Sequence, residues 1–511
     1  MSIADRLKNI CDTSPDKLAF VGEDRSLTYK DFDSETTKLA SVFAETLQTS
    51  KGQRVILSLP NSVDYVVCLF AAYKAGVTVI PANPMLKVHE IRHVLQTSGA
   101  PILITSPEFL EQIRNLEEFG NLKHLIISGP AQTGFKGLQV HTLAEMKESG
   151  EGDFQPVQTD SEDIASIFFT SGTTGKAKGA MLSYPLIISH GDSTVEAVHM
   201  SPEDRHICVL PMTHLFGQDL AIIPTVLSGG TVYIVERFDA EKVLSVLTEN
   251  RITVMAGVNT MYARMVEVPN AKDYDLSSLR AVIAGAAALF AEVSGKFKET
   301  FNIEILPAYG STETSVVTVT PPEGPIKTGS IGKPIPGVAV SVQDENGNLL
   351  PPGVAGELMV RKDCVMSGYL NLPEANKDSF RGDWYHTGDI ITMDEDDYIF
   401  IVGRKKEMIN TSGYSVFPKE VEDIISKSNK VKEVAVVGLP DKVRGEIVAA
   451  FVVPASQDLT IDDVLSFCQD NLATYKIPRR VELVHDLPKT SSTGKIEKKA
   501  LRDRYGSGQS Q

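Results

Sequence analysis

Short apolar runs alternate with amphipathic segments along most of the chain. The runs Ala165–Phe169, Thr231–Val235 and Val282–Ala284 have the length of buried strands, and Ala240–Asn250 repeats its apolar positions at helical spacing. Strands that alternate with helices are typical of parallel sheets covered by helices. The pattern therefore predicts an α/β fold built from helix-flanked sheets.

The pattern changes after Gly403. A very polar segment, GRKKEMINTSGYS, precedes a region of about a hundred residues, which is a common domain size. We predict that this region contains a helix at Pro418–Ser426, strands at Val434–Val437 and Ile447–Val453, and a second helix capped by Thr460.

This change predicts a large N-terminal domain and a small C-terminal domain. We place the large domain at 1–403, the hinge at 404–406 and the small domain at 407–511. The last residues, 506–511, read GSGQSQ, a low-complexity sequence that we expect to be disordered.

A loop rich in glycine and hydroxyl groups follows the predicted strand Ala165–Phe169. The segment TSGTTGKAKG (170–179) holds three glycines, four hydroxyl side chains and two lysines. Such a loop is suited to phosphate, because backbone N–H groups and hydroxyls can surround an anion. The P-loop pattern G-x-x-x-x-G-K-[ST] is not met, since Thr170 replaces its first glycine and Ala177 its magnesium-binding hydroxyl. The segment therefore predicts a phosphate site of another kind.

Composition and charge narrow the choice of partners. The chain has 511 residues, of which 23% are charged and 42% hydrophobic, as in ordinary globular proteins. Its formal net charge of −16 argues against a nucleic-acid partner and against docking on anionic lipid. An anionic ligand must therefore be held by local basic groups.

Three features predict a cytoplasmic protein without a membrane span. Asp5 and Arg6 interrupt the apolar stretch that a signal peptide requires. The densest apolar run, Tyr65–Tyr73, is too short to cross a bilayer. Five widely spread cysteines, never in C-x-x-C spacing, fit neither a disulfide framework nor a cysteine zinc site.

One motif suggests a different function, which we set aside. The segment His89–His93 matches H-E-x-x-H, in which two histidines one helical turn apart bind zinc in metalloproteases. On a helix, Ile91, Val94 and Leu95 would form an apolar stripe and leave both histidines on the opposite, solvated face. No third ligand suggests itself downstream, so we interpret the segment as an ordinary surface helix. The chain also lacks the G-x-S-x-G elbow of many serine hydrolases.

Four further segments point to one chemistry when they are taken together. They are LPMTHLFG (210–217), YGSTE (309–313), YHTGD (385–389) and LPKTSSTGK (487–495). Alone, each has an ordinary explanation: Asp389 can end a turn, Glu313 can cap a helix, and Lys495 can be a solvated loop residue. With the phosphate loop, in this order and spacing, they resemble the adenylate-forming superfamily. That superfamily includes acyl-CoA synthetases, peptide-synthetase adenylation domains and firefly luciferase.

The resemblance runs from LTYKDF (27–32) almost to the C-terminus and is greatest to the bacterial fatty-acyl-CoA ligases. It implies a large N-terminal domain and a small, mobile C-terminal lid that pivots at GRKKE. It also implies a reaction in which a carboxylate attacks the α-phosphate of ATP and expels pyrophosphate, after which the thiol of CoA displaces AMP. The protein's part is to position the reactants and to neutralise charge on the phosphoryl oxygens.

The resemblance assigns the nucleotide site position by position. The β- and γ-phosphates would be held by Thr170, Ser171, Gly172, Thr173, Thr174, Gly175 and Lys178. The rest of AMP would contact Gly285, Ala286, Ala287, Tyr309, Gly310, Ser311, Thr312 and Glu313. Within that set Tyr309 would stack on adenine, Thr312 would bind the α-phosphate, and Glu313 would bind Mg²⁺, a hard cation suited to carboxylate oxygen.

The C-terminal part of the resemblance supplies the remaining groups. Asp389 and Arg404 would contact the ribose, and Lys406 stands at the hinge position. Lys495 would bridge the substrate carboxylate and the α-phosphate as a compact charge. CoA would contact Ser412, Gly413 and Tyr414, and the glycine would let the pantetheine arm pass close to the backbone. The resemblance thus names Lys495, Glu313, Thr170 and His214 as the catalytic set.

The acid is the least explicit part of the assignment. The resemblance places the acyl pocket at His214, Phe216, Val258, Met261 and Ala287. Small residues at 285–287 leave space and Val258 and Met261 offer apolar walls, which suits a medium- or long-chain fatty acid. Peptide-synthetase domains carry an aspartate where this chain has Phe216 or Gly217, so an α-amino acid would bury an unpaired ammonium here.

Several alternatives remain open at this point. An aromatic acid of the coumarate or benzoate kind would also fit, an acyl carrier protein could replace free CoA, and a luciferase-type oxidase would share the same adenylation motifs. The chain also departs from the family at Ala177, Ala288 and Asn259, where proline is usual. Asn259 borders the acyl pocket in relatives, whereas the other two are expected to be chemically silent.

Overall fold

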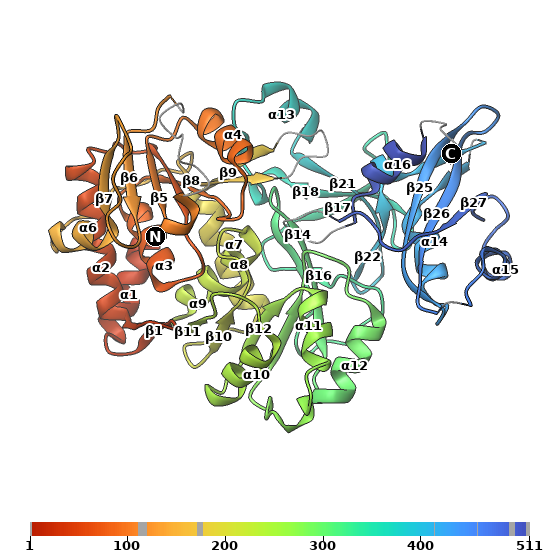
Figure 1. The fold of residues 1–511 in the computed structure, drawn as a ribbon, viewed down its shortest axis with the longest axis horizontal. Helices are drawn as coiled ribbons and strands as arrows, with labels where there is room; N and C mark the ends of the chain where they lie inside the picture. The colour runs from red at the N-terminus through yellow and green to blue at the C-terminus, as the bar shows by residue number, and fades with distance from the viewer. Residues whose placement is uncertain are drawn as a thin grey trace. The chain divides into compact units, whose positions relative to one another are not determined.

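The structure, a computed structural model, describes residues 3–110, 120–170, 177–412, 414–456, 458–489 and 496–506. The chain divides into two compact units, one formed by 1–340 with 360–385 and the other by 341–359 with 386–511. Each unit contains β-sheet and helices, and the predicted α/β class is confirmed (Figure 1). The hinge at 404–406 stays a prediction.

A mixed sheet of nine described strands runs through the first unit (Figure 1). In spatial order its strands are β16 (Lys333–Pro334), β15 (Ser315–Val319), β14 (Ile305–Ser311), β13 (Ala281–Ala284), β12 (Val254–Gly257), β10 (Arg205–Cys208), β11 (Thr231–Ile234), β1 (Leu18–Val21) and β2 (Ser26–Thr28). The six strands from β14 to β1 are parallel, and β15, β16 and β2 add antiparallel edges. The carboxyl ends of the parallel strands therefore lie along one edge of the sheet.

A second sheet of the same unit has eight described strands. Its order is β19 (Gly368–Tyr369), β9 (Lys178–Ser183), β8 (Ile164–Thr170), β4 (Thr78–Pro81), β3 (Arg54–Ser58), β5 (Ile102–Thr105), β6 (His124–Ile127) and β7 (Gln139–Thr142). Strands β8 to β7 are parallel, whereas β9 and β19 pair antiparallel at one end. The predicted phosphate loop joins β8 to β9.

Helices connect these strands and bury their apolar faces. The longer ones are α1 (Ile3–Thr13), α2 (Tyr29–Ser41), α3 (Val63–Lys74), α7 (Tyr184–Val198), α10 (Ala240–Glu249), α11 (Asn259–Val266) and α12 (Ala291–Phe301). The apolar run Tyr65–Tyr73 lies within α3 and is buried throughout, as expected for a helix that is apolar on all sides. In the part of the chain that the structure describes, every helix is too short or too polar to span a bilayer.

The H-E-x-x-H segment forms part of α4 (Val88–Ser98), as predicted, and Ile91, Val94 and Leu95 are its buried stripe. The prediction for the histidines is only half right. His89 is exposed, but His93 is partly buried, and its Nε2 lies 2.8 Å from the carbonyl oxygen of Ala177. The two histidines are therefore not a pair on one solvated face, because His93 reaches the chain where the phosphate loop ends.

The second unit contains the predicted C-terminal elements. Its strands are β22 (Ile399–Arg404), β23 (Ile409–Thr411), β24 (Tyr414–Val416), β25 (Val431–Asp441), β26 (Gly445–Pro454) and β27 (Arg480–Leu483), and its helices are α14 (Pro418–Ile425), α15 (Ile461–Asn471) and α16 (Lys498–Gly506). Thr460 caps α15 and exchanges hydrogen bonds with Asp463, so the predicted cap is confirmed. The predicted tail at 506–511 begins at the last residue of α16, and 507–511 lie outside the described residues.

A five-stranded sheet carries part of the YHTGD segment. Its order is β17 (Val340–Gln343), β18 (Gly356–Arg361), β21 (Trp384–Met393) and β20 (Phe380–Arg381), with β22 paired to β21. The pairing of β21 with β22 is antiparallel and sets Asp389 opposite Arg404. Two residues that the resemblance assigns to the ribose are thus neighbours across one strand pair.

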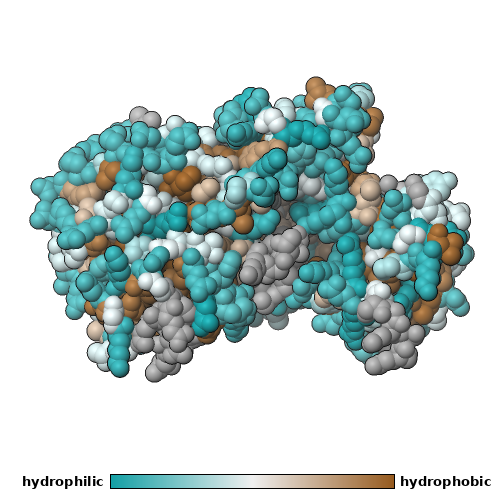
Figure 2. Space-filling model, turned by 90° about the horizontal axis from the view of Figure 1, so that it is seen from above, coloured by the Kyte–Doolittle hydropathy of each residue, from teal (hydrophilic) through white to brown (hydrophobic). Residues whose placement is uncertain are grey.

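Apolar side chains form separate hydrophobic cores within each unit. Figure 2 shows that hydrophilic side chains cover most of one face of the molecule, with hydrophobic ones scattered among them. All five cysteines are free and buried, and burial raises the pKa of each thiol above its ordinary value. The protein thiols are therefore held as neutral, inaccessible groups.

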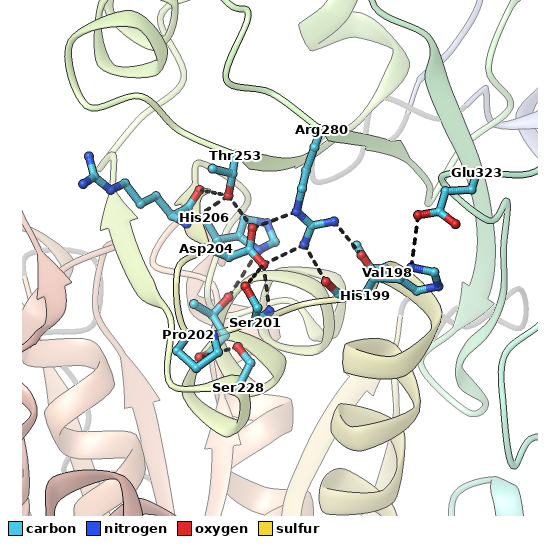
Figure 3. A network of polar contacts seen from close by, with 12 residues as sticks. Val198, His199, Ser201, Pro202, Asp204, His206, Ser228, Thr253, Arg280 and Glu323 are labelled. Atoms are coloured by element: carbon cyan, nitrogen blue, oxygen red, sulfur yellow. Dashed lines mark hydrogen bonds and ion pairs between the residues drawn. The ribbon is translucent and has the colours of Figure 1, made fainter. Parts of the chain in front are cut away.

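A buried polar network joins the amino ends of three neighbouring strands (Figure 3). Asp204 precedes β10, Thr253 precedes β12 and Arg280 precedes β13. Arg280 donates two hydrogen bonds to the Asp204 carboxylate, at 2.8 and 2.7 Å, and Thr253 donates a third at 2.6 Å. Arg280 also donates to the carbonyl oxygens of Val198 and His199 at the end of α7. The network fixes the edge of the sheet opposite the carboxyl ends.

Candidate active site

Residues of the predicted nucleotide and acyl sites follow the carboxyl ends of the parallel strands of the nine-stranded sheet. His214 and Phe216 come after β10, Val258 follows β12, Gly285 follows β13, and Tyr309 ends β14. Open α/β sheets bind their ligands outside the carboxyl ends of the strands, because the loops there converge. The topology therefore brings together residues that are far apart in sequence.

The small residue Gly285 does not leave an empty space, which corrects the sequence interpretation. A Cβ atom at this position would lie 2.7 Å from two ring atoms of Phe216, so the phenyl ring already occupies the space above the glycine. His214 is exposed at the start of the short helix α8 (Leu215–Gly217), where its Nδ1 accepts a hydrogen bond from the Phe216 N–H at 3.2 Å. His214 thus holds the backbone of the residue whose ring covers Gly285.

This contact gives a first prediction. Gly285→Ala should displace the Phe216 ring and lower kcat/KM for the acid about tenfold, because overpacking of this kind costs about 1–3 kcal/mol. Steady-state kinetics with the acid varied at saturating ATP measure the effect. The matched control is Gly295→Ala in α12, where a Cβ meets nothing within 4 Å and kinetics should stay unchanged. Equal kinetics for both variants would contradict a role of the Phe216–Gly285 contact in acid binding.

The other predicted pocket residues differ in their exposure. Val258 and Met261 are partly buried against the hydrophobic core, whereas Ala287 is exposed. Asn259 is buried, and its Oδ1 accepts a hydrogen bond from the Phe290 N–H at 3.0 Å. The departure from proline at Asn259 therefore anchors the backbone of the segment that follows Gly285.

The turn between β14 and β15 presents Thr312 and Glu313. Its own hydroxyl groups hold it: Ser311 N–H donates to Thr314 Oγ1 at 3.0 Å, and Glu313 N–H donates to Ser311 Oγ at 3.2 Å. Gly310 is required because a Cβ there would lie 2.1 Å from the Ser315 carbonyl oxygen. The turn is thus rigid around the two side chains that the resemblance assigns to the α-phosphate and the metal.

A buried carboxyl group supports this turn from below. Ser315 has a positive φ of 54°, and its hydroxyl donates a hydrogen bond to Asp219. Burial raises the pKa of Asp219 to about 7, against an ordinary value of 3.8. Sequence reasoning missed Asp219, because no motif distinguishes it from other polar residues after His214. The side chain links the segment after His214 to the nucleotide turn.

Glu313 and Lys178 meet on either side of one tyrosine. The Tyr369 hydroxyl donates a hydrogen bond to Glu313 Oε1 at 2.8 Å, and the Lys178 ammonium lies 4.9 Å from the centre of the Tyr369 ring. Tyr385 is hydrogen-bonded to the Tyr369 hydroxyl. Burial, followed by the charge of Glu313, raises the pKa of both phenols, so they remain protonated donors. Tyr369 was missed by sequence reasoning, and Tyr385 was only part of the YHTGD segment.

The two ends of the phosphate loop are described, but its centre is not. Thr170 ends β8 and its hydroxyl donates to the Lys178 carbonyl oxygen at 3.4 Å, while Lys178 begins β9. The assigned residues between them, Ser171, Gly172, Thr173, Thr174 and Gly175, lie outside the described residues. His93, which contacts Ala177, was an unexpected neighbour of this loop.

One carboxylate is available for the predicted metal. Among the residues that the structure describes, no three His, Cys, Asp or Glu side chains gather around a point that could hold a metal ion. Glu313 alone still fits Mg²⁺, because this ion is usually held by one or two carboxylates together with substrate phosphates and water. The donor set therefore suits a metal that arrives with ATP rather than one that stays bound to the protein.

The second unit holds the residues assigned to the ribose. Asp389 is buried, and its carboxylate pairs with Arg404, whose Nε lies 2.7 Å from Oδ1. The neighbouring Glu357 receives hydrogen bonds from His386 and Lys405. Burial alone would raise the pKa of Glu357, but these partners outweigh it and hold the pKa below its ordinary value. A charged, ordered cluster thus surrounds Asp389.

The residues assigned to the hinge, the adenylation lysine and CoA are described only in part. Lys406 is exposed in the turn after β22, and Gly413 and Lys495 lie outside the described residues. Ser412 N–H donates to the Arg444 carbonyl oxygen at 2.9 Å, and the Arg444 guanidinium donates to the Ser412 hydroxyl at 3.2 Å.

The segment that follows Ser412 carries an exposed aromatic pair. The Tyr414 ring is stacked on Tyr475, with ring centroids 4.7 Å apart. Both rings are solvent-exposed, so the segment assigned to CoA presents a polar and aromatic surface.

Comparison with known proteins agrees with this geometry. The family model described as AMP-binding enzyme matches residues 7–370, and that of the AMP-binding enzyme C-terminal domain matches 420–495. A long-chain-fatty-acid–CoA ligase of Salmonella typhimurium is 32% identical over 96% of this chain and 92% of its own length. A feruloyl-CoA synthase of an Amycolatopsis species is also 32% identical, over 94% of each chain.

A solved structure shares the fold over the whole length. ATP-bound MatB from Rhodopseudomonas palustris has a TM-score of 0.89 and 30% identity, and the match covers 99% of both chains. The resemblance to adenylate-forming enzymes that the motifs indicated is thereby confirmed. The chain belongs to the AMP-binding enzyme family.

Proposed function

We propose that the protein activates a medium- or long-chain fatty acid to acyl-AMP and transfers the acyl group to the thiol of CoA. An adenylate-forming ligase activity on an acyl or aryl acid follows from the family and its relatives. The nature of the acid and of the acceptor is our proposal. The observation that carries it is the meeting of Glu313 and Lys178 at Tyr369, beside a pocket segment lined by apolar side chains.

The first step requires negative charge to be neutralised around the α-phosphate. Lys178 supplies a cation at the end of the phosphate loop, and Thr312 supplies a hydroxyl on the rigid turn. Mg²⁺ held by Glu313 and the phosphates would neutralise further charge as pyrophosphate leaves. On this view Tyr309 binds adenine and the Asp389 carboxylate binds the ribose hydroxyls, so that the nucleotide is fixed before the acid attacks.

The apolar segment favours a fatty acid over an amino acid. Phe216, Val258 and Met261 supply apolar surface and pack against the core. The one carboxyl group near Phe216 in sequence, Asp219, is fully buried and bonded to Ser315, and its raised pKa keeps it largely protonated below about pH 7. An ammonium group would therefore lose its hydration without gaining a charged partner.

An aromatic acid is the second candidate. The feruloyl-CoA synthase is as similar to this chain as the long-chain-fatty-acid–CoA ligase, at 32% identity. The Phe216 ring above Gly285 also offers a flat surface on which an aromatic substrate could stack. An acyl carrier protein as acceptor, a luciferase-type oxidation and a cytoplasmic location stay predictions of the same kind.

A panel of acids tests the proposal. Pyrophosphate release with ATP and Mg²⁺ should rise from acetate to octanoate and laurate by roughly fourfold per methylene, because each buried methylene contributes about 0.8 kcal/mol until the pocket ends. Glycine and phenylalanine should give no release. Omission of CoA should stop acyl-CoA formation but not the first release of pyrophosphate. A flat response across the fatty acids, or a preference for ferulate or benzoate, would replace the fatty-acid assignment by the aromatic one.

A further inference from the structure

We propose that Tyr369 is a positioning residue of the nucleotide site: its hydroxyl orients the Glu313 carboxylate, and its ring holds the ammonium of Lys178. The proposal rests on the proposed function, because it gives Tyr369 a part in the binding of Mg²⁺-ATP. It concerns the coupling between two groups that come from different sheets of the first unit.

Strand pairing places Tyr369 beside Lys178. Strand β19 pairs antiparallel with β9, and Tyr369 lies opposite Ala180. Alternate residues of a strand share a face of the sheet, so Lys178, two residues before Ala180, is on the same face as Tyr369. The ammonium therefore lies over the ring, 4.9 Å from its centre. A cation in this position is attracted by the ring and limited in its motion.

Two hydrogen bonds attach the same segment to the nucleotide turn. The Met366 N–H donates to the Glu313 carbonyl oxygen at 2.8 Å, which fixes the backbone of the turn. The Tyr369 hydroxyl donates to Glu313 Oε1, also at 2.8 Å, which fixes its side chain. Glu313 belongs to the nine-stranded sheet and Lys178 to the eight-stranded sheet, so Tyr369 joins the ends of both.

The geometry leaves Glu313 free to bind a cation in one orientation. A carboxylate offers about four lone-pair positions on two oxygens, and the Tyr369 hydroxyl takes only one of them. Tyr385 is hydrogen-bonded to the same hydroxyl, and this second phenol limits its rotation. The ordered pair of phenols therefore holds the carboxylate in place while its remaining lone pairs can accept the metal of Mg²⁺-ATP.

The hydroxyl is tested by Tyr369→Phe, which keeps the ring. Calorimetric titration with ATP at increasing Mg²⁺ should show a half-saturating Mg²⁺ concentration about tenfold higher than in the wild type, the usual size for loss of a partner of a metal ligand. ATP affinity without metal should stay within about twofold, and kcat at saturating Mg²⁺ should be nearly unchanged. The matched control is Tyr29→Phe, which removes a buried hydroxyl that donates to the Gly230 carbonyl oxygen at 2.7 Å, far from Glu313 in the chain.

The ring is tested by Tyr369→Leu. This variant should show the same Mg²⁺ effect and, in addition, a roughly twofold to fivefold loss of ATP affinity without metal, because the Lys178 ammonium loses its aromatic contact. Thermal unfolding of each variant shows that the fold is kept. The two substitutions thus separate the hydroxyl from the ring.

Three outcomes would overturn the proposal. They are an unchanged Mg²⁺ requirement in Tyr369→Phe, an equal change in Tyr29→Phe, and ATP binding by the wild type that does not respond to Mg²⁺. Failure of the proposed function would look different, since the wild-type enzyme would then form no acyl-AMP from any acid in the panel.

Discussion

Lys495→Ala is expected to lower acyl-AMP formation by at least about a thousandfold and to leave thioester formation from supplied acyl-AMP largely intact. The lysine would place a compact positive charge between the substrate carboxylate and the α-phosphate, where negative charge builds up in the first step only. Removal of a single stabilising group from such a site usually costs about 10²–10³ in kcat, and loss of a full charge should cost at least the upper value. Pyrophosphate exchange measures the first step, and CoA acylation from synthetic acyl-AMP measures the second.

Lys489 provides the matched control, because it lies in the same LPKTSSTGK segment. Its ammonium pairs with Glu433 at 2.7 Å, and both side chains are partly exposed. Lys489→Ala should therefore leave both half-reactions within about twofold, as expected for a surface ion pair. If Lys495→Ala stays folded and loses both half-reactions equally, the separation of the two steps does not hold for this protein.

The second large effect concerns stability. Arg280→Leu should lower the free energy of unfolding by about 3–5 kcal/mol at pH 7, because it leaves the buried Asp204 carboxylate without its charged partner. Chemical unfolding monitored by far-UV circular dichroism measures the loss. The control is Lys296→Ala, which breaks an exposed ion pair with Glu292 and should cost less than about 0.5 kcal/mol.

This effect should depend on pH in a defined direction. Burial alone would raise the pKa of Asp204, but hydrogen bonds from Arg280, Thr253 and Ser201 outweigh it and hold the pKa below the ordinary value of 3.8. The stabilisation is therefore complete above about pH 4 and is lost as the pH falls through the folded-state pKa. The difference between wild type and Arg280→Leu should shrink in acid. A difference that stays constant down to the acid limb would show that Arg280 acts through packing alone.

The sequence predicted the elements of this fold well where burial leaves a regular pattern. The runs at 165–169, 231–235 and 282–284 became β8, β11 and β13 with boundaries shifted by one residue at most. The strands at Val434–Val437 and Ile447–Val453 were predicted too short, because β25 and β26 continue pairing up to their turn at Asp441 and Gly445. Cross-strand pairing adds polar residues to a strand, and hydrophobic periodicity does not detect them.

The candidate site was predictable only where a motif names the residue. Thr312, Glu313 and Asp389 were found because their segments match a family pattern. Phe216 filling the space at Gly285, and Tyr369 between Glu313 and Lys178, are contacts between segments far apart in sequence. Such contacts arise from strand order and loop packing, so no local spacing announces them. The same is true of His93, which looked like a solvated helix residue and instead contacts Ala177.

The five buried thiols have a practical consequence for the study of this protein. A thiolate is the form that attacks disulfide reagents, and here burial both blocks access and raises the pKa of every cysteine. A colorimetric thiol reagent added to the native protein therefore reports the free thiol of CoA with little background from the enzyme. Consumption of CoA can be followed continuously in this way, and the later appearance of five additional equivalents marks the point at which the protein unfolds.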